Sequence, residues 1–196
     1  MIDDCTGLIL AGGDSRRMGR DKTALEFDGQ TLLQRAVDLL QGVFPQVLVS
    51  VRQPRGDVAA PQVLDELPDA GPLAGLCAGL ARSATPWVFA MAADMPFLRP
   101  EVIRELAARR DGYDAVVPVV QGHPQPLAAY YAATALPALR AVLAGPGKRS
   151  LRAALEQLNV VFVHEDQLLS ADPARQSFID LDTPADLATL AVGRKT

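Results

Sequence analysis

One stretch decides the fold: Leu8-Ile9-Leu10-Ala11-Gly12-Gly13-Asp14-Ser15-Arg16-Arg17-Met18-Gly19-Arg20-Asp21-Lys22. It begins as an apolar run that stops at two glycines, which predicts a buried strand followed by a tight turn. Glycine lets the backbone turn sharply and bring its N–H groups against a ligand. Four cations lie within the next positions (16, 17, 20 and 22), and cations beside exposed N–H groups suit a phosphate chain. We therefore expect a phosphate-binding loop at the end of the first strand.

The spacing within this loop excludes the two best-known phosphate-binding motifs. A Walker loop needs Gly-Lys-Ser/Thr, whereas Lys22-Thr23 follows Asp21 here. The dinucleotide fingerprint G-x-G-x-x-G is absent because Gly12 and Gly13 are adjacent. A dinucleotide-binding oxidoreductase is therefore a remote alternative.

Helices alternate with apolar strands through the first two thirds of the chain. Apolar, β-branched runs predict strands at 8–10, 47–51, 63–64, 87–92, 115–120, 127–131, 160–163 and 178–181. Helical periodicity predicts helices at 31–41, 72–81, 100–109, 134–143 and 150–158, with a last helix opening at Thr183-Pro184. This alternation favours one α/β domain over residues 1–196, with a doubly wound, mostly parallel sheet and helices on both faces.

The helix expected to begin after Thr31 carries a specific start signal. The Thr31 hydroxyl can cap its first turn, and Gln34 follows three residues later, which is the spacing of a capping box.

Composition narrows the class of function. A formal net charge of −4 argues against a general nucleic-acid binder, so the cations of the first loop are a local feature that favours a small anionic ligand. Cys5 and Cys77 lie too far apart for a CxxC motif and predict neither a disulfide framework nor a metal site. The chain shows no signal-peptide pattern and no membrane-spanning run, so we expect a cytoplasmic protein without membrane association.

Acidic residues are expected near the phosphate loop. Open α/β sheets bind ligands at the carboxyl ends of their strands, where Gly12, Asp65, Gly71 and Asp94 all fall. Phosphoryl and nucleotidyl transfer need cations and N–H groups around the phosphates and a carboxylate that holds Mg²⁺. Asp94 follows an apolar strand directly, which favours it as the metal ligand; the alternative is a turn former or helix cap.

The first-loop stretch resembles the signature L-x-G-G-x-x-x-R-M-G-x-D-K of nucleotidyltransferases, and most closely that of the MobA-like molybdenum cofactor guanylyltransferase family. The resemblance continues in order along nearly the whole chain. It includes Asp65 ahead of Gly71-Pro72-Leu73-Ala74-Gly75, then Asp94-Met95-Pro96, Gln125-Pro126-Leu127 and residues 180–187 (Asp-Leu-Asp-Thr-Pro-Ala-Asp-Leu).

The resemblance implies a nucleotide-diphospho-sugar transferase-like fold and a role for each matched residue. Those on the nucleotide side would bind GTP: Leu10, Ala11, Gly12 and Gly13 by contact, Arg17 and Lys22 by neutralising phosphate, Asp65 at guanine or ribose, and Gly71 to Gly75 along the base pocket. Asp94 would ligate Mg²⁺, with Arg17, Lys22 and Asp94 as the catalytic set. Gln125, Asp180 and Asp182 would lie on the pterin side.

The implied reaction is attack by the terminal phosphate of molybdopterin on the α-phosphorus of GTP, with release of pyrophosphate. Its substrates would be GTP and molybdopterin, its cofactor Mg²⁺, and its further partners molybdoenzyme-maturation proteins. The chain departs from the family pattern at Ser50, Asp180 and Asp182, where the family has Asn. Ser50 can still offer one hydrogen bond to the nucleotide, whereas the two added carboxylates would repel an anionic pterin phosphate unless Mg²⁺ or Arg compensates.

Three alternative functions remain open. The chain could transfer from CTP to molybdopterin, or from a nucleoside triphosphate to a sugar phosphate. It could also be a non-catalytic GTP-binding relative that kept the fold.

Overall fold

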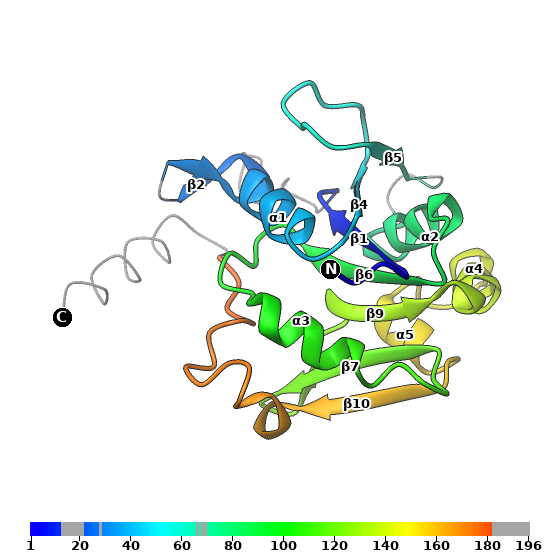
Figure 1. Ribbon diagram of the computed structural model, residues 1–196. Helices are drawn as coiled ribbons and strands as arrows, with labels where there is room; N and C mark the ends of the chain where they lie inside the picture. Colours follow the sequence, from blue (N-terminus) through cyan, green and yellow to red (C-terminus); the bar gives the residue numbers. More distant parts are fainter. Residues whose placement is uncertain (13–21, 28, 66, 68–69, 182–196) are drawn as a thin grey trace.

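The computed structural model describes residues 1–12, 22–27, 29–65, 67 and 70–181 (Figure 1). Its centre is an eight-stranded sheet in the order β10-β7-β9-β6-β1-β4-β5, with β8 paired to β7. The strands are β1 (Cys5–Leu10), β4 (Gln46–Val51), β5 (Gln62–Leu64), β6 (Trp87–Ala92), β7 (Ala115–Val120), β8 (His123–Pro124), β9 (Ala128–Ala132) and β10 (Val160–His164). A small hairpin, β2 (Glu26–Phe27) and β3 (Gln30–Thr31), lies apart from this sheet.

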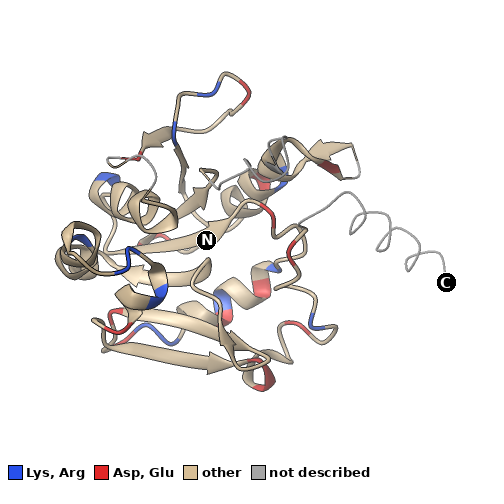
Figure 2. Cartoon of the chain, turned by 180° about the vertical axis from the view of Figure 1, so that it is seen from behind, with Lys and Arg blue, Asp and Glu red and all other residues tan. Residues whose placement is uncertain are grey.

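Five α-helices of the described residues cover the sheet. They are α1 (Leu32–Gln41), α2 (Pro72–Arg82), α3 (Pro100–Ala107), α4 (Leu136–Ala144) and α5 (Leu151–Leu155), with short 3-10 turns η2 (Lys22–Ala24), η3 (Ala133–Ala135) and η4 (Glu165–Leu168). Within the described ranges, no helix has the length and apolar character needed to cross a bilayer. Basic and acidic residues are interspersed over the outer helices and loops (Figure 2).

Two apolar layers, one on each face of the sheet, hold the helices in place. Alternate residues of one strand contribute side chains to opposite layers, because successive side chains of a strand point to opposite faces. In β1, Ile9 packs with α1 and α3, whereas Leu8 packs with α2, α4 and α5. α1 and α3 thus cover one face and α2, α4 and α5 the other (Figure 1). The expected doubly wound, mostly parallel sheet with helices on both faces is confirmed.

The direction of β9 matters for the site. β4, β1 and β6 run parallel, whereas β9 runs antiparallel to both β6 and β7. The amino end of β9 therefore lies at the carboxyl end of β6. The backbone N–H of Ala92, the last residue of β6, donates to the carbonyl oxygen of Leu127, just ahead of β9, at 3.0 Å.

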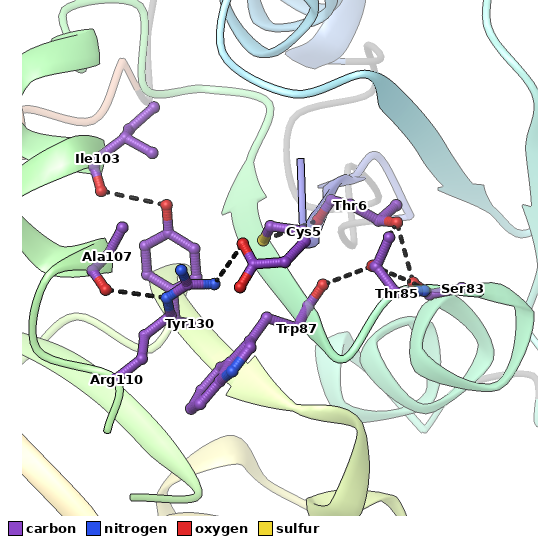
Figure 3. Close-up of polar contacts among 10 residues, drawn as sticks. Cys5, Thr6, Ser83, Thr85, Trp87, Ile103, Ala107, Arg110 and Tyr130 are labelled. Atoms are coloured by element: carbon purple, nitrogen blue, oxygen red, sulfur yellow. Dashed lines mark hydrogen bonds and ion pairs between the residues drawn. The ribbon is translucent and has the colours of Figure 1, made fainter. Parts of the chain in front are cut away.

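The opposite edge of the sheet is closed by side-chain hydrogen bonds (Figure 3). The hydroxyls of Thr6, Ser83 and Thr85 lie 2.8 to 2.9 Å from one another. Arg110 donates to Asp4 at 3.1 Å and to the carbonyl oxygen of Ala107 at 2.9 Å. Its guanidinium also stacks over the rings of Trp87 and Tyr130, at 5.5 and 5.4 Å from their centroids. These contacts link the amino ends of the strands to one another and so stabilise this edge of the sheet.

The expected strand at 178–181 is wrong. The N–H of Ile179 bonds to the carbonyl oxygen of Gln176 in a turn, and the N–H of Leu181 bonds to the carbonyl oxygen of Asp94. Leu181 is fully buried in a separate cluster with Phe27 and Leu32. Its apolar character therefore reflects packing against the β2–β3 hairpin and α1 rather than a place in the sheet.

The helix starts are predicted more accurately than the ends. Thr31 caps α1 by accepting from the N–H of Gln34 at 3.1 Å, as expected. The reciprocal half of the capping box is absent, because the Gln34 side chain donates to Asp38 at 2.7 Å instead. The helix expected at 150–158 extends only over Leu151–Leu155, and the one expected from Thr183 lies outside the described residues.

Candidate functional site

The carboxyl ends of the central strands converge at one edge of the sheet. Leu10 of β1 pairs in register with Ser50 of β4 on one side and with Ala92 of β6 on the other. The N–H of Ala11 donates to the carbonyl oxygen of Ser50 at 3.0 Å, so pairing continues one residue past β1. Gly12 and Asp94 therefore leave neighbouring strands at the same edge, where open α/β sheets bind their ligands.

A serine–aspartate pair lies beside Gly12. The Ser50 hydroxyl donates to Oδ1 of Asp65 at 2.5 Å, and the Asp65 N–H donates to the carbonyl oxygen of Val51 at 3.2 Å. Ser50 is buried, with 1% of its surface exposed, and Asp65 is partly buried. Asp65 is thus held through both its backbone and its side chain.

Two glycines allow this close packing. A Cβ added to Gly12 would lie 3.2 Å from Oδ2 of Asp65. A Cβ added to Gly75, in the first half of α2, would overlap the Ser50 hydroxyl and lie 2.7 Å from Cδ2 of Leu10. The structure therefore brings together Leu10, Gly12, Ser50, Asp65 and Gly75 from four separate segments of the chain.

Arg52 is a residue of this site that the sequence motifs miss. Its Cγ and Nε would lie 3.5 and 3.9 Å from a Cβ on Gly12. The signal in the sequence is its place two residues after Ser50, at the exit of β4. A guanidinium at this point adds a positive charge next to the start of the phosphate loop.

The environment of Asp65 acts on its protonation in two directions. Partial burial raises the pKa of Asp65, whereas the Ser50 hydrogen bond and the nearby Arg52 guanidinium lower it, and burial prevails. This carboxyl is therefore easier to protonate than a solvent-exposed aspartate.

α2 approaches the same site with its amino end. Gly71 precedes it with a φ of +67°, a conformation that favours glycine, and Pro72 occupies the first turn as expected from its missing N–H. The positive end of the α2 helix dipole thus lies at this site and favours negative charge nearby.

The pterin-side candidates gather near Asp94. The N–H of Leu181 donates to the carbonyl oxygen of Asp94 at 3.0 Å, which brings the exposed residue Asp180 next to the Asp94 segment. Gln125 lies two residues ahead of Leu127, whose carbonyl oxygen accepts from Ala92. The three segments that carry Asp94, Gln125 and Asp180 thus meet at one edge.

Several predicted site residues are not placed. Gly13, Arg17 and Asp182 lie outside the described residues, and for Lys22 the structure describes only the backbone, at the start of η2. Among the residues that are described, no three His, Cys, Asp or Glu side chains gather as a metal cluster. A single carboxylate is nevertheless the usual protein share of an Mg²⁺ site that is completed by substrate phosphates and water.

Known proteins of one family resemble this chain over most of its length. The model of the MobA-like NTP transferase domain matches residues 7–161. A probable molybdenum cofactor guanylyltransferase of Chloroflexus aggregans is 40% identical over 190 residues, which cover 93% of this chain and 91% of the relative. A relative from Methanosarcina mazei, also described as a probable molybdenum cofactor guanylyltransferase, is 34% identical over 94% of this chain and 89% of its own length.

A solved structure agrees with these matches. The molybdopterin-guanine dinucleotide biosynthesis protein A from Archaeoglobus fulgidus superposes with a TM-score of 0.83 at 30% identity. The match covers 97% of this chain and all of that one. The matched domain spans the glycine loop, the Ser50–Asp65 pair and Asp94, so the chain belongs to the MobA-like NTP transferase family.

Proposed function

We propose that this protein transfers GMP from GTP to the terminal phosphate of molybdopterin in an Mg²⁺-dependent reaction, giving the guanine dinucleotide form of the cofactor and pyrophosphate. The single observation that carries the proposal is the juxtaposition of Gly12 and Asp94. Both leave parallel strands at the same edge, because Leu10 and Ala92 are paired in register.

In this proposal the residues around Gly12 bind the nucleotide. Backbone N–H groups after Leu10, together with Arg17 and Lys22, would neutralise the triphosphate, and Asp65 would accept hydrogen bonds from guanine or ribose. Gly71 and Gly75 would let α2 approach the base closely. Support for guanine comes from the names of the relatives in Chloroflexus and Methanosarcina, both described as guanylyltransferases.

Asp94 would hold Mg²⁺ at this edge. When bound, Mg²⁺ supplies charge neutralisation on the phosphate oxygens and on the departing pyrophosphate. The carboxylate suits that role because it lies two residues past the end of a buried strand and is partly exposed at the edge. The acceptor phosphate would approach from the side of Gln125 and Asp180. Its oxygen bonds to the α-phosphorus as the bond to the bridging oxygen breaks.

Transfer requires that the two reactants be held in line, and no covalent intermediate with the protein is needed. The sheet edge supports this arrangement, since Gly12 and Gln125 flank the Asp94 segment through β1 on one side and β9 on the other. Positioning and electrostatic stabilisation account for most of the rate enhancement in phosphoryl transfer of this kind.

The test is a transfer assay with purified components. Protein, molybdopterin, GTP and MgCl₂ are combined and the products are identified by mass spectrometry, with parallel samples that contain CTP in place of GTP or EDTA in place of Mg²⁺. We expect the guanine dinucleotide and pyrophosphate in the first sample and neither in the EDTA sample. A cytosine dinucleotide formed in preference to the guanine product would overturn the base assignment. GTP binding without any product would favour the non-catalytic reading.

A further inference from the structure

We infer that Ser50 is a positioning residue: it holds Asp65 so that one carboxylate oxygen meets the nucleoside part of the substrate, and Ser50 does not contact the substrate itself. The inference rests on the proposed function and deepens it. It assigns the polar contact with the nucleoside to Asp65 and the orientation of that contact to Ser50.

The hydrogen of the Ser50 hydroxyl is already used. A hydroxyl has one hydrogen to donate, and that of Ser50 is directed at Oδ1 of Asp65 over 2.5 Å. With 1% of its surface exposed, Ser50 has almost no access to a ligand in solution. Its position at the exit of β4 therefore serves Asp65 rather than the nucleotide directly.

The two carboxylate oxygens of Asp65 face different neighbours. Oδ1 lies toward Ser50 and Gly75, whereas Oδ2 lies toward Gly12, at 3.2 Å from the point where a Cβ would be. Gly12 is the first glycine of the loop after β1. Oδ2 thus lies beside the start of the loop that binds the nucleotide in the proposed function.

An ionised carboxylate only accepts hydrogen bonds. It therefore recognises donor groups, and a guanosine offers two kinds: the ring N–H and amino group of guanine, and the ribose hydroxyls. Both lie on the nucleoside and neither on the phosphates. Loss of orientation at Asp65 should thus weaken nucleoside binding and leave the chemistry at the α-phosphorus nearly unchanged.

α2 keeps the pair in this arrangement. The absence of a side chain at Gly75 lets the Ser50 hydroxyl pack directly against α2, and Leu10 and Asp65 Oδ1 approach the same glycine. The hydroxyl is enclosed on these sides, which favours a single orientation. The Ser50 hydrogen bond also favours the charged form of Asp65, so its removal should raise the pKa of that carboxyl further.

The experiment is a double-mutant cycle with GTP binding and transfer kinetics as readouts. The variants are Ser50→Ala, Asp65→Ala and the two combined, with Ser50→Thr as the conservative variant that keeps the hydroxyl. For Ser50→Ala we expect a KM and a Kd for GTP that are about tenfold higher, since hydrogen bonds to charged groups are the stronger class. We expect kcat to fall less than about threefold, because the interaction acts in binding rather than only in the transition state.

The remaining variants separate positioning from a general structural role. Ser50→Ala should change little further in the Asp65→Ala background, because the acceptor of the Ser50 hydrogen bond is already absent there. Ser50→Thr should recover most of the affinity. The acidic limb of GTP binding should move to higher pH in Ser50→Ala. Thermal unfolding of each variant, measured in parallel, checks that all of them fold.

Additive effects of the two substitutions, or an unchanged KM in Ser50→Ala, would overturn the inference. If the wild-type protein binds GTP and transfers GMP while the two effects are additive, the inference alone fails. If the wild-type protein does not bind GTP, the proposed function fails together with it. Binding of 2′-deoxy-GTP, which lacks the ribose 2′-hydroxyl, and of ITP, which lacks the guanine amino group, then identifies the group that Asp65 contacts. The wild type should bind the analogue without that group more weakly than GTP, whereas the variant without Asp65 should bind the two equally.

Discussion

The backbone N–H of Leu181 donates to the carbonyl oxygen of Asp94 at 3.0 Å, and so links residues 87 positions apart in the chain. Leu181 is fully buried against Phe27 and Leu32, which fixes this end of the described chain. The segment that carries Asp180 is therefore anchored beside the proposed metal ligand. This contact explains how a late sequence motif reaches a site built mainly from the first hundred residues.

Removing the charge of Asp65 should stabilise the protein while it impairs binding. Burial raises the pKa of Asp65 above its usual value of 3.8, so ionisation costs more in the folded state than in the unfolded state. This destabilisation is absent at pH values below the pKa of Asp65 in the unfolded state and complete once the pH exceeds its pKa in the folded state. Asp65→Asn should therefore unfold at a higher temperature than the wild type at pH 8. The difference between the two unfolding temperatures should decrease as the pH is lowered toward 4. A variant less stable than wild type at pH 8 would contradict this account.

Gly75→Ala should disrupt the site from the side of α2. The added Cβ would overlap the Ser50 hydroxyl and crowd Leu10, so either α2 or the Ser50–Asp65 pair must move. We expect the affinity for GTP to fall at least tenfold and stability to fall by about 1–3 kcal/mol, the usual cost of overpacking. Gly147→Ala is the matched control, because a Cβ at Gly147 meets no atom within 4 Å. Equal effects of the two substitutions on GTP affinity, measured by isothermal titration calorimetry, would count against the packing argument.

Both cysteines should be inert in the folded protein. Cys5 and Cys77 are buried, with exposures of 0% and 1%, and burial raises the pKa of the Cys5 thiol to about 12. The thiolate is the reactive form, so burial limits access to both thiols and the raised pKa further disfavours reaction of Cys5 at pH 8. Titration with a coloured disulfide reagent should detect no fast-reacting thiol in native protein and two after unfolding in urea. A thiol that reacts within seconds under native conditions would show that one cysteine is accessible.

The cap of α1 should contribute measurably to stability. Thr31 accepts from the N–H of Gln34 at 3.1 Å, and its loss in Thr31→Ala leaves that N–H without its partner. We expect a decrease of about 1 kcal/mol in the free energy of unfolding, measured by urea denaturation. Thr31→Ser keeps the acceptor oxygen and should remain within about 0.5 kcal/mol of wild type. An equal loss in both variants would mean that the methyl group, rather than the cap, stabilises the helix.

The central strands could be predicted from the sequence because their signals are local. β1, β4 and β6 are short segments rich in apolar residues, and strands buried on both faces in a parallel sheet have this composition. Once the sheet is parallel, the carboxyl ends of β1 and β6 must share an edge. The meeting of Gly12 and Asp94 at one edge follows from topology, without any knowledge of side-chain contacts.

The parts that could not be predicted depend on tertiary contacts. Residues 178–181 have the apolar pattern of a strand, yet Leu181 is buried against Phe27 from the other end of the chain. The direction of the Ser50 hydroxyl depends on Asp65, which reaches it only because β5 pairs with β4. Arg52 belongs to no motif: its place after β4 puts it at the right end of the sheet, but its approach to Gly12 is a tertiary contact.

The most direct test of the central claim compares Asp94→Asn with Asp111→Asn. Asp111 is an exposed carboxyl between α3 and β7, at the opposite edge of the sheet, so it controls for the loss of one negative charge. The rate of guanine dinucleotide formation is measured at saturating GTP, molybdopterin and MgCl₂, with GTP affinity determined separately. We predict that Asp94→Asn lowers the rate by about a hundredfold or more, a loss of roughly 2.7 kcal/mol of transition-state stabilisation, while much of the GTP affinity remains. Asp111→Asn should match the wild type. A rate for Asp94→Asn within threefold of the wild type would contradict the account, because the carboxylate that leaves β6 beside Gly12 would then have no part in the transfer.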